Sequence, residues 1–234
     1  NKLLELQGNI RVFCRVRPIM EIERKRGEDV DITAFPTAED LIIQRDVVTK
    51  TQYEYDRVFK PSATQEEVFS QVQPVCISVL DGYNICIFAY GQTGSGKTFT
   101  MEGPATNRGV NVRALQAMFE EGHARRKSLG MAFTFSVTMC EIYREEVYDL
   151  LQEGKTESGV RQKITLRQGK KGVFADGLHS VVVESAEDVE NDGLRSMPPF
   201  ITSNPNTTDP FNFIPQPLLA KKFVRYAGEP ILLI

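Results

Sequence analysis

Residues 84–98 read Asn84-Ile85-Cys86-Ile87-Phe88-Ala89-Tyr90-Gly91-Gln92-Thr93-Gly94-Ser95-Gly96-Lys97-Thr98. The first six form a nearly continuous apolar run, which is typical of a strand buried on both faces in a helix-covered sheet. The last eight match the pattern G-x-x-x-x-G-K-[ST] in full. Phe99-Thr100-Met101 then reads as the start of a helix. A buried strand, a glycine-rich loop and a helix in this order predict an α/β fold built around a P-loop.

The loop Gly91–Thr98 has the residue types that a phosphate site needs. Its glycines let the backbone N–H groups point inward, where they cradle phosphate oxygens, and the following helix adds the positive end of its dipole. Lys97 is expected to reach the β- and γ-phosphates, and the Thr98 hydroxyl to ligate Mg²⁺. A turn that only reverses the chain has no use for this Lys-Thr pair. We therefore predict a magnesium–nucleotide site whose phosphate-binding residues are Gly91, Gln92, Thr93, Gly94, Ser95, Gly96, Lys97 and Thr98.

The composition is that of an ordinary globular protein. The 234 residues are 41% apolar and 25% charged, enough for one large domain or two small ones. A net charge of −3 gives no global basic field for nucleic acid or for an anionic membrane. No apolar run approaches the roughly 18 residues of a membrane helix. The cysteines lie in apolar runs without metal-ligand spacing, and we expect buried, reduced thiols at Cys14, Cys76, Cys86 and Cys140.

Hydrophobic periodicity places further elements around the loop. Thr64-Gln65-Glu66-Glu67 is a capping box, so a helix is expected from Thr64 to Asp81-Gly82, with Pro74 kinking or loosening its middle. A second helix is expected over Val112–Lys127. Strands are expected at Ile10–Val16, Leu41–Ile43, Tyr53–Val58, Met131–Tyr143 and, as short pieces, within Thr165–Val183.

The chain changes character near Asn191. Seven of the twelve prolines lie between Pro198 and Pro230, and periodicity is lost until Ile231–Ile234. Such a segment has little apolar surface with which to offset the entropy of ordering. We therefore expect residues 191–234 to be disordered or to form a loosely packed arm.

Motifs spread from Gly8 to about Val189 resemble the kinesin motor domain, in the order and spacing of that family. Those nearest the loop are Gly82-Tyr83-Asn84, Phe88–Thr98 and Thr100-Met101-Glu102-Gly103. The others are Cys14-Arg15-Val16-Arg17-Pro18, Tyr55-Asp56-Arg57-Val58-Phe59, Glu141-Ile142-Tyr143 and Glu146-Val147-Tyr148-Asp149-Leu150-Leu151. In addition, Glu5-Leu6-Gln7-Gly8-Asn9-Ile10 resembles the neck-to-motor junction of the C-terminal-motor, kinesin-14 group.

The resemblance implies a P-loop NTPase fold of the kinesin type, with a central mixed β-sheet flanked by helices and truncated after roughly its first half. It divides the chain into a neck or stalk junction (1–9), a partial motor domain (10–190) and a divergent proline-rich tail (191–234). It also implies a cytoplasmic, microtubule-associated ATPase that uses ATP and Mg²⁺. In the full protein, a coiled-coil stalk outside this chain would join two copies.

The resemblance implies roles for residues outside the loop. Arg15 and Pro18 match positions that contact adenine, and Phe99 stands where many relatives place a ring near the base. The alternatives are that Pro18 only ends a strand, that Arg15 is solvated and that Phe99 belongs to the core. Tubulin contact is implied for Arg167, Lys170 and Lys171, which could equally be solvated charges around a glycine turn.

Two segments of the kinesin pattern do not occur in these 234 residues. One is Asn-x-x-Ser-Ser-Arg-Ser-His and the other Asp-Leu-Ala-Gly-x-Glu, both of which respond to the γ-phosphate in the family. Since phosphoryl transfer depends on such positioned groups, hydrolysis is in doubt and the catalytic residues stay unassigned. Two readings remain: a microtubule-motor ATPase, or a non-catalytic fragment that binds nucleotide or a partner. A non-motor P-loop ATPase or GTPase is disfavoured, because no Asn/Thr-Lys-x-Asp guanine reader is present and the flanking motifs resemble those of kinesins.

Overall fold

The computed structural model describes residues 10–27, 30–46, 48–83, 85–151, 163–169 and 172–189, and the short segments Leu219–Ala220 and Pro230–Leu233. The chain forms two compact units, the first of residues 1–114 with 225–234 and the second of residues 115–224. Each unit is described by itself. The predicted junction at residues 1–9 lies outside the described residues.

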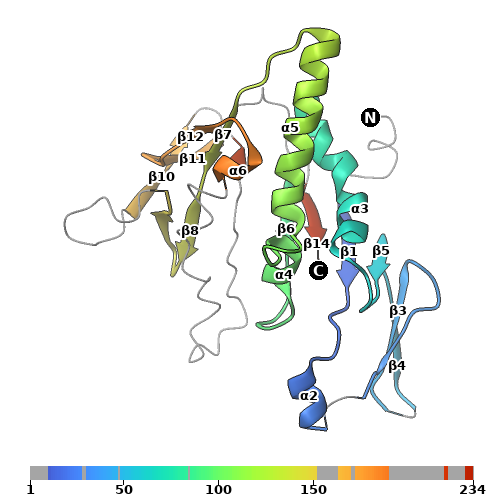
Figure 1. Cartoon of the computed structure of the whole chain (residues 1–234). Helices are drawn as coiled ribbons and strands as arrows, with labels where there is room; N and C mark the ends of the chain where they lie inside the picture. Colours follow the sequence, from blue (N-terminus) through green and yellow to red (C-terminus); the bar gives the residue numbers. More distant parts are fainter. Residues whose placement is uncertain are drawn as a thin grey trace. The chain divides into compact units, whose positions relative to one another are not determined.

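The first unit contains a four-stranded sheet in which every pairing is parallel. Its strand order is β5 (Arg57–Phe59), β1 (Arg11–Arg15), β14 (Pro230–Leu233) and β6 (Cys86–Ala89) (Figure 1). In register, Leu232 lies opposite Val12 on one side and Phe88 on the other. The strand predicted at Ile10–Val16 is therefore confirmed as β1.

Strand β14 belongs to the segment for which disorder or loose packing was expected. It lies inside the sheet, between two strands that come from the first 89 residues of the chain. The sequence Pro230-Ile231-Leu232-Leu233 is where apolar character returns to the tail. Residues 191–218, 221–229 and 234 lie outside the described residues, and for them the expectation stays a prediction.

Strand β6 is less buried than its sequence indicated. Cys86 is exposed, and Ile87, Phe88 and Ala89 are only partly buried. The reason is its place in the sheet: β6 is the last strand of this sheet in the described part of the chain, with β14 on one side. The expectation of four buried thiols is accordingly wrong for Cys86 and confirmed for the other three cysteines, which are buried and free.

Helix α3 (Gln65–Ser78) begins with the predicted capping box. The Thr64 hydroxyl accepts from the Glu67 N–H at 3.1 Å, and the Glu67 carboxylate accepts from the Thr64 N–H at 2.8 Å. Pro74 lies inside the helix without ending it; a 3₁₀ turn (Val79–Asp81) and Gly82, at φ 94°, end it instead. One face is buried through Val68, Phe69, Val72, Val75 and Cys76.

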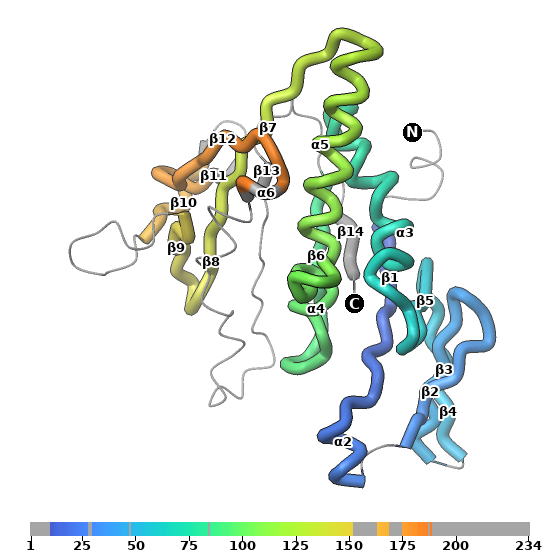
Figure 2. The backbone as a smooth tube through the Cα atoms, in the orientation of Figure 1, coloured from blue at the N-terminus to red at the C-terminus, as the bar shows by residue number. Residues whose placement is uncertain are grey.

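A small antiparallel sheet branches from the first unit. It comprises β2 (Thr33–Ala34), β3 (Asp40–Gln44) and β4 (Lys50–Glu54), and the chain reaches it from β1 through α2 (Glu21–Lys25) (Figure 2). The single strand predicted at Tyr53–Val58 is instead two, β4 and β5. The break falls at Asp56, whose carboxylate accepts the Val12 N–H at 2.7 Å and so turns the chain from one sheet to the other.

The second unit is built on antiparallel pairing. One sheet has the order β11 (Gly172–Asp176), β10 (Lys163–Gly169), β9 (Glu146–Asp149) and β8 (Cys140–Tyr143). The other has the order β12 (Val181–Val183), β7 (Phe135–Thr138) and β13 (Leu219–Ala220). The strand predicted at Met131–Tyr143 is thus divided at Met139, because β7 and β8 join different sheets.

Two further helices contribute to the second unit. Helix α5 (Val110–Leu129) confirms the helix predicted at Val112–Lys127, and the division between the units falls within it. In the second unit the ring centroids of Phe119 from α5 and Phe135 from β7 lie 4.4 Å apart. A short helix, α6 (Ala186–Val189), follows β12. None of the helices described has both the length and the apolar composition needed to cross a bilayer.

The interior place of β14 gives a testable consequence. Leu232→Pro removes a backbone donor from a strand that is paired on both sides, so its partner carbonyl is left unsatisfied. A loss of about 2 kcal/mol in the free energy of unfolding is expected, since an unsatisfied buried group costs about 1–3 kcal/mol. Urea denaturation measures the loss. Leu232→Val keeps the donor and is the matched control; equal midpoints for the two variants would show that β14 does not hold the sheet together.

Candidate nucleotide-binding site

The P-loop joins the end of β6 at Ala89 to the start of α4 (Lys97–Met101). Gly96 is the N-cap of α4 and has φ 99°, a left-handed conformation that costs a residue with a side chain roughly 1–2 kcal/mol. The predicted sequence of strand, glycine loop and helix is therefore present in the fold. The loop residues Gln92, Thr93 and Gly94 are exposed.

Lys97 is folded back along the loop. Its ammonium donates hydrogen bonds to the Gly91 carbonyl at 2.7 Å and to the Gln92 carbonyl at 2.9 Å. Partial burial lowers the pKa of Lys97 from its usual value, because desolvation penalises the charged form. Both partners are neutral oxygens, so they orient the ammonium without neutralising it. The positive charge can therefore act on an anionic ligand at the loop.

The donor set also fits a Mg²⁺ ion that arrives with a phosphate. Mg²⁺ keeps several waters and takes few protein ligands, with phosphate oxygens completing its shell. The Thr98 hydroxyl belongs to an exposed residue in the first turn of α4, next to Lys97. Among the described residues no group of three or more His, Cys, Asp or Glu side chains is arranged to hold a metal. In the part of the chain that the structure describes, the arrangement that fits Mg²⁺ is therefore the Thr98 hydroxyl together with phosphate oxygens of the ligand.

Arg15, at the end of β1, reaches the helix that follows the P-loop. Its Nη1 donates to the Thr100 hydroxyl at 3.1 Å and to Gln65 Oε1 at 2.7 Å, and its Nη2 donates to the Ala63 carbonyl at 3.2 Å. Its guanidinium carbon lies 5.2 Å from the centroid of the Phe99 ring, a cation–π contact. Burial lowers the pKa of Arg15. The alternative that Arg15 is merely solvated is therefore wrong.

The other two residues implied for the base lie in different settings. Phe99 is 48% exposed, which excludes the alternative that it is a core residue of the helix. The structure brings it together with Arg15 and with Lys97 and Thr98 of the loop. Pro18 is exposed in the connection between β1 and α2, and its contact with the base stays a prediction.

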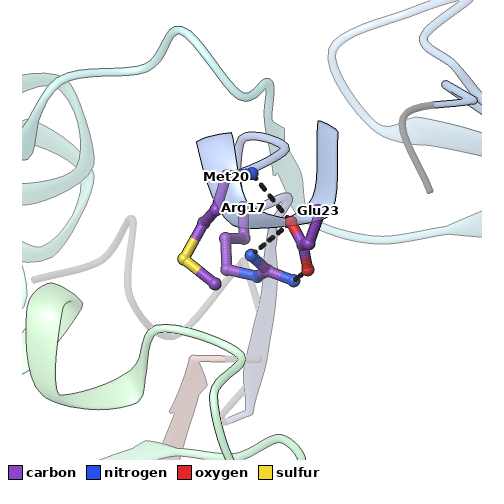
Figure 3. A network of polar contacts seen from close by, with 3 residues as sticks. All are labelled: Arg17, Met20 and Glu23. Atoms are coloured by element: carbon purple, nitrogen blue, oxygen red, sulfur yellow. Dashed lines mark hydrogen bonds and ion pairs between the residues drawn. The ribbon is translucent and has the colours of Figure 1, made fainter. Parts of the chain in front are cut away.

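Next to Pro18, a polar network holds the chain as it leaves β1 (Figure 3). Arg17 donates to both carboxylate oxygens of Glu23, at 2.9 and 2.5 Å, and the Met20 N–H donates to Glu23 at 2.7 Å. The Arg17 hydrogen bond and then the Met20 N–H lower the pKa of Glu23 to about 2. The sequence analysis did not predict this network, because no motif singled out Arg17 or Glu23 as partners.

The pKa of Glu23 provides a measurement of this network. Its carboxyl resonance in an NMR titration is expected to have a midpoint of about 2. Because the folded pKa is below the unfolded value, the carboxylate stabilises the fold above pH 4.5, and this contribution is lost as the pH falls to about 2. Arg17→Met removes the main cause and is expected to move the midpoint toward 4.5. An unchanged midpoint would contradict the assignment; Arg24→Met, at an exposed arginine of α2 that is not among the causes of the shift, is the control.

The hairpin implied for tubulin contact lies in the second unit. Arg167 in β10 pairs with Asp176 in β11 at 2.9 Å, and both side chains are exposed, at 63% and 45%. Lys170 and Lys171 lie outside the described residues. Of the three predicted contact residues, the structure therefore describes only Arg167. Its side chain is exposed and forms an ion pair with a carboxylate.

A parallel sheet whose strand β6 leads through G-x-x-x-x-G-K-T into a helix defines a P-loop nucleotide-binding α/β protein. The kinesin motor domain matches this chain over residues 15–192. The chain therefore belongs to the kinesin motor domain family.

Its relatives carry kinesin-14 names. It is 45% identical over 174 residues to kinesin-like protein KIN-14S of Arabidopsis thaliana, covering 74% of this chain and 22% of the relative. It is also 45% identical over 183 residues to KIN-14R of Oryza sativa subsp. japonica, covering 77% of this chain and 17% of the relative. The chain thus spans about a fifth of the length of these relatives.

Solved kinesin structures have the same fold. One is the KIF14 391–772 dimer, a two-heads-bound state with AMP-PNP in complex with a microtubule. The match has a TM-score of 0.70 and 28% sequence identity, and it covers 79% of this chain and 52% of that chain. The structure of a fast kinesin has a TM-score of 0.70 and 29% identity over 78% of this chain and 51% of its own. The expected kinesin-type P-loop fold is confirmed.

Proposed function

We propose that this chain is the nucleotide-binding part of a kinesin-14 microtubule motor and that it binds ATP with Mg²⁺ at Gly91–Thr98. The observation that carries the proposal is the complete P-loop between β6 and α4, with Lys97 hydrogen-bonded along the loop, in a chain of the kinesin family. AMP-PNP is present in the microtubule-bound kinesin that resembles it.

The residues have separate tasks in this proposal. Backbone N–H groups of the loop bind the phosphate oxygens, and Lys97 supplies the positive charge that faces the β- and γ-phosphates. Thr98 would hold Mg²⁺, which neutralises phosphate charge when bound. The proposed contacts to the nucleotide base come from Arg15, Phe99 and Pro18. In this proposal, the residues of the chain therefore bind and orient the nucleotide.

Removal of the Lys97 ammonium tests ATP binding. Lys97→Ala is expected to weaken ATP binding by about 10- to 100-fold, which corresponds to roughly 1.4–2.8 kcal/mol. Equilibrium binding of a fluorescent ATP analogue in Mg²⁺ buffer measures the change. Lys127→Ala, at an exposed position in the last turn of α5, is the matched control. Equal affinities for the two variants would mean that nucleotide does not bind at this loop.

The sequence supports a second candidate, a non-catalytic kinesin fragment that acts as a nucleotide- or partner-binding module. This candidate is favoured because neither of the two kinesin patterns that respond to the γ-phosphate occurs in the printed sequence. Without such groups a P-loop binds nucleotide but leaves the attacking water unpositioned.

Steady-state phosphate release with and without microtubules separates the two candidates. Stimulation by microtubules that Lys97→Ala abolishes would exclude the non-catalytic fragment. ATP binding without turnover would exclude a motor ATPase for this chain. We expect the second outcome, because the residues that would position water are not in the sequence.

We further propose that the β10–β11 hairpin contributes to tubulin binding through Arg167, Lys170 and Lys171, and that the protein acts on cytoplasmic microtubules. Dimerisation would lie with a coiled-coil stalk outside this chain. Microtubule co-sedimentation at low ionic strength tests the hairpin, since exposed charges act mainly when salt screening is weak. Arg167→Ala is expected to weaken binding about threefold, roughly 0.6 kcal/mol.

A variant of the partner carboxylate supplies the matched control. Asp176→Asn leaves Arg167 in place but removes the carboxylate that forms an ion pair with it. This variant is expected to bind microtubules as well as the parent chain or more tightly. Equal weakening by both substitutions would indicate that the hairpin structure matters and that the Arg167 charge does not.

A further inference from the structure

Gln65 is a polar side chain in an unusual place. It is the first residue of α3, directly after the N-cap Thr64, yet only 1% of it is exposed. Glutamine is mostly a surface residue, and a buried amide is destabilising unless both its oxygen and its nitrogen are hydrogen-bonded. The partners of this amide therefore indicate what the residue does.

Both ends of the amide are bonded, and both bonds lead to the base side of the proposed nucleotide site. Oε1 accepts from Arg15 Nη1 at 2.7 Å, and Nε2 donates to the Phe99 carbonyl at 2.5 Å. Thus one side chain connects the end of β1 to the helix after the P-loop. Arg15 and Phe99 are also in direct contact, with the guanidinium 5.2 Å from the ring centroid.

The Phe99 carbonyl needs this donor. Helix α4 has five residues, and the last carbonyls of a helix lack partners within it. The Gly103 N–H, which an ideal helix would direct to Phe99, instead bonds the Thr98 carbonyl at 3.2 Å. The Gln65 amide supplies the missing hydrogen bond, so it fixes the backbone of α4 at the residue that carries the ring.

The turn after α4 is packed against the same amide. Gly103 has φ 65°, and a Cβ atom placed there would lie 2.8 Å from Gln65 Nε2 and 2.3 Å from the Asn107 carbonyl oxygen. A side chain at this position would therefore displace the amide or the turn. Because no space separates them, the Gln65 amide has little freedom to move.

Only an amide of this length meets both requirements. A glutamate would accept from Arg15 but could not donate to the Phe99 carbonyl, and a lysine could donate but not accept. Moreover, the amide leaves the Arg15 charge unneutralised, as do its other partners, the Thr100 hydroxyl and the Ala63 carbonyl. The result is a cation held over an aromatic ring that is itself 48% exposed.

We propose that Gln65 is a positioning residue for the nucleobase: it holds the Arg15 guanidinium against the Phe99 ring and so pre-forms the surface on which the base stacks. This inference rests on the proposed binding of ATP at the loop. Phe99 follows Thr98 directly, so a nucleotide whose phosphates lie on Lys97 and Thr98 has an exposed aromatic ring within reach of its base. Gln65 is buried and acts through Arg15 and Phe99, without touching the nucleotide.

The role is tested by comparing a ligand that has a base with one that lacks it. The full chain is titrated with ATP and with inorganic tripolyphosphate, each in competition with a fluorescent ATP analogue. Gln65→Ala is expected to weaken ATP about 5- to 10-fold, in the range of one base-stacking contact, and to change tripolyphosphate affinity less than about twofold. Gln71→Ala, an exposed glutamine on the same helix, is expected to change neither affinity.

Two further variants make the outcome decisive. Phe99→Ala should reproduce the selective loss for ATP, and Gln65→Ala added to Phe99→Ala should produce little additional loss. Gln65→Glu keeps the size of the side chain and the acceptor for Arg15 but loses the donor to Phe99. Gln65→Glu should show the same selective loss for ATP. It takes the place of Gln65→Ala if circular dichroism shows that Gln65→Ala does not fold.

Each result has one meaning. Equal loss of both ligands in Gln65→Ala or Gln65→Glu would show a general structural role and overturn the inference, as would full ATP affinity in either variant. By contrast, a parent chain that binds neither ATP nor tripolyphosphate would overturn the proposed function itself. The two failures are therefore distinguishable.

Discussion

The proposed nucleotide site depends on the backbone pairing of β6 in the parallel sheet. The P-loop has no regular structure that could hold it, so its position is set by the strand before it and the helix after it. Strand β6 is held through β14, which pairs along its whole length and pairs β1 on the other side. A ladder of this kind fixes direction and register together, because parallel strands share one direction and a shifted register changes which side chains face the core. The loop can present its N–H groups to a phosphate only if this ladder is intact.

Charge near the loop is oriented by neutral groups. Lys97 bonds to the carbonyls of Gly91 and Gln92, and Arg15 bonds to an amide, a hydroxyl and a carbonyl. Burial lowers the pKa of both cations, because desolvation penalises the charged form. Farther from the loop, by contrast, Arg17 is neutralised by Glu23. The printed contacts of Lys97 and Arg15 are thus with neutral groups, whereas the Arg17–Glu23 pair holds the connection that follows β1.

The two units contribute different things to the proposed motor. The first unit contains the sheet, the P-loop and the Arg15–Gln65–Phe99 contacts, for which we propose a role in nucleotide binding. The second unit is a set of antiparallel strands with a buried core of Cys140, Val147 and Ile164 and an exposed hairpin that carries Arg167. We propose ATP binding for the first unit and tubulin contact for the second. Whether the chain turns over ATP depends on groups that respond to the γ-phosphate, and those patterns do not occur in its sequence.

The sequence by itself determined the local features: the strand, loop and helix around Gly91–Thr98, the capping box at Thr64, the long helix α5 and the kinesin family. Each rests on short-range rules, namely periodicity, turn chemistry and motif spacing. Only the tertiary structure decided the rest. It divided Tyr53–Val58 and Met131–Tyr143 between sheets, placed a strand from the proline-rich tail between β1 and β6, and left Cys86 exposed. It also showed Gln65 as the buried link between Arg15 and Phe99, where the sequence indicated only part of a helix cap. Such features depend on partners far away in the chain, and no local pattern specifies which distant backbone or side chain will supply a hydrogen bond.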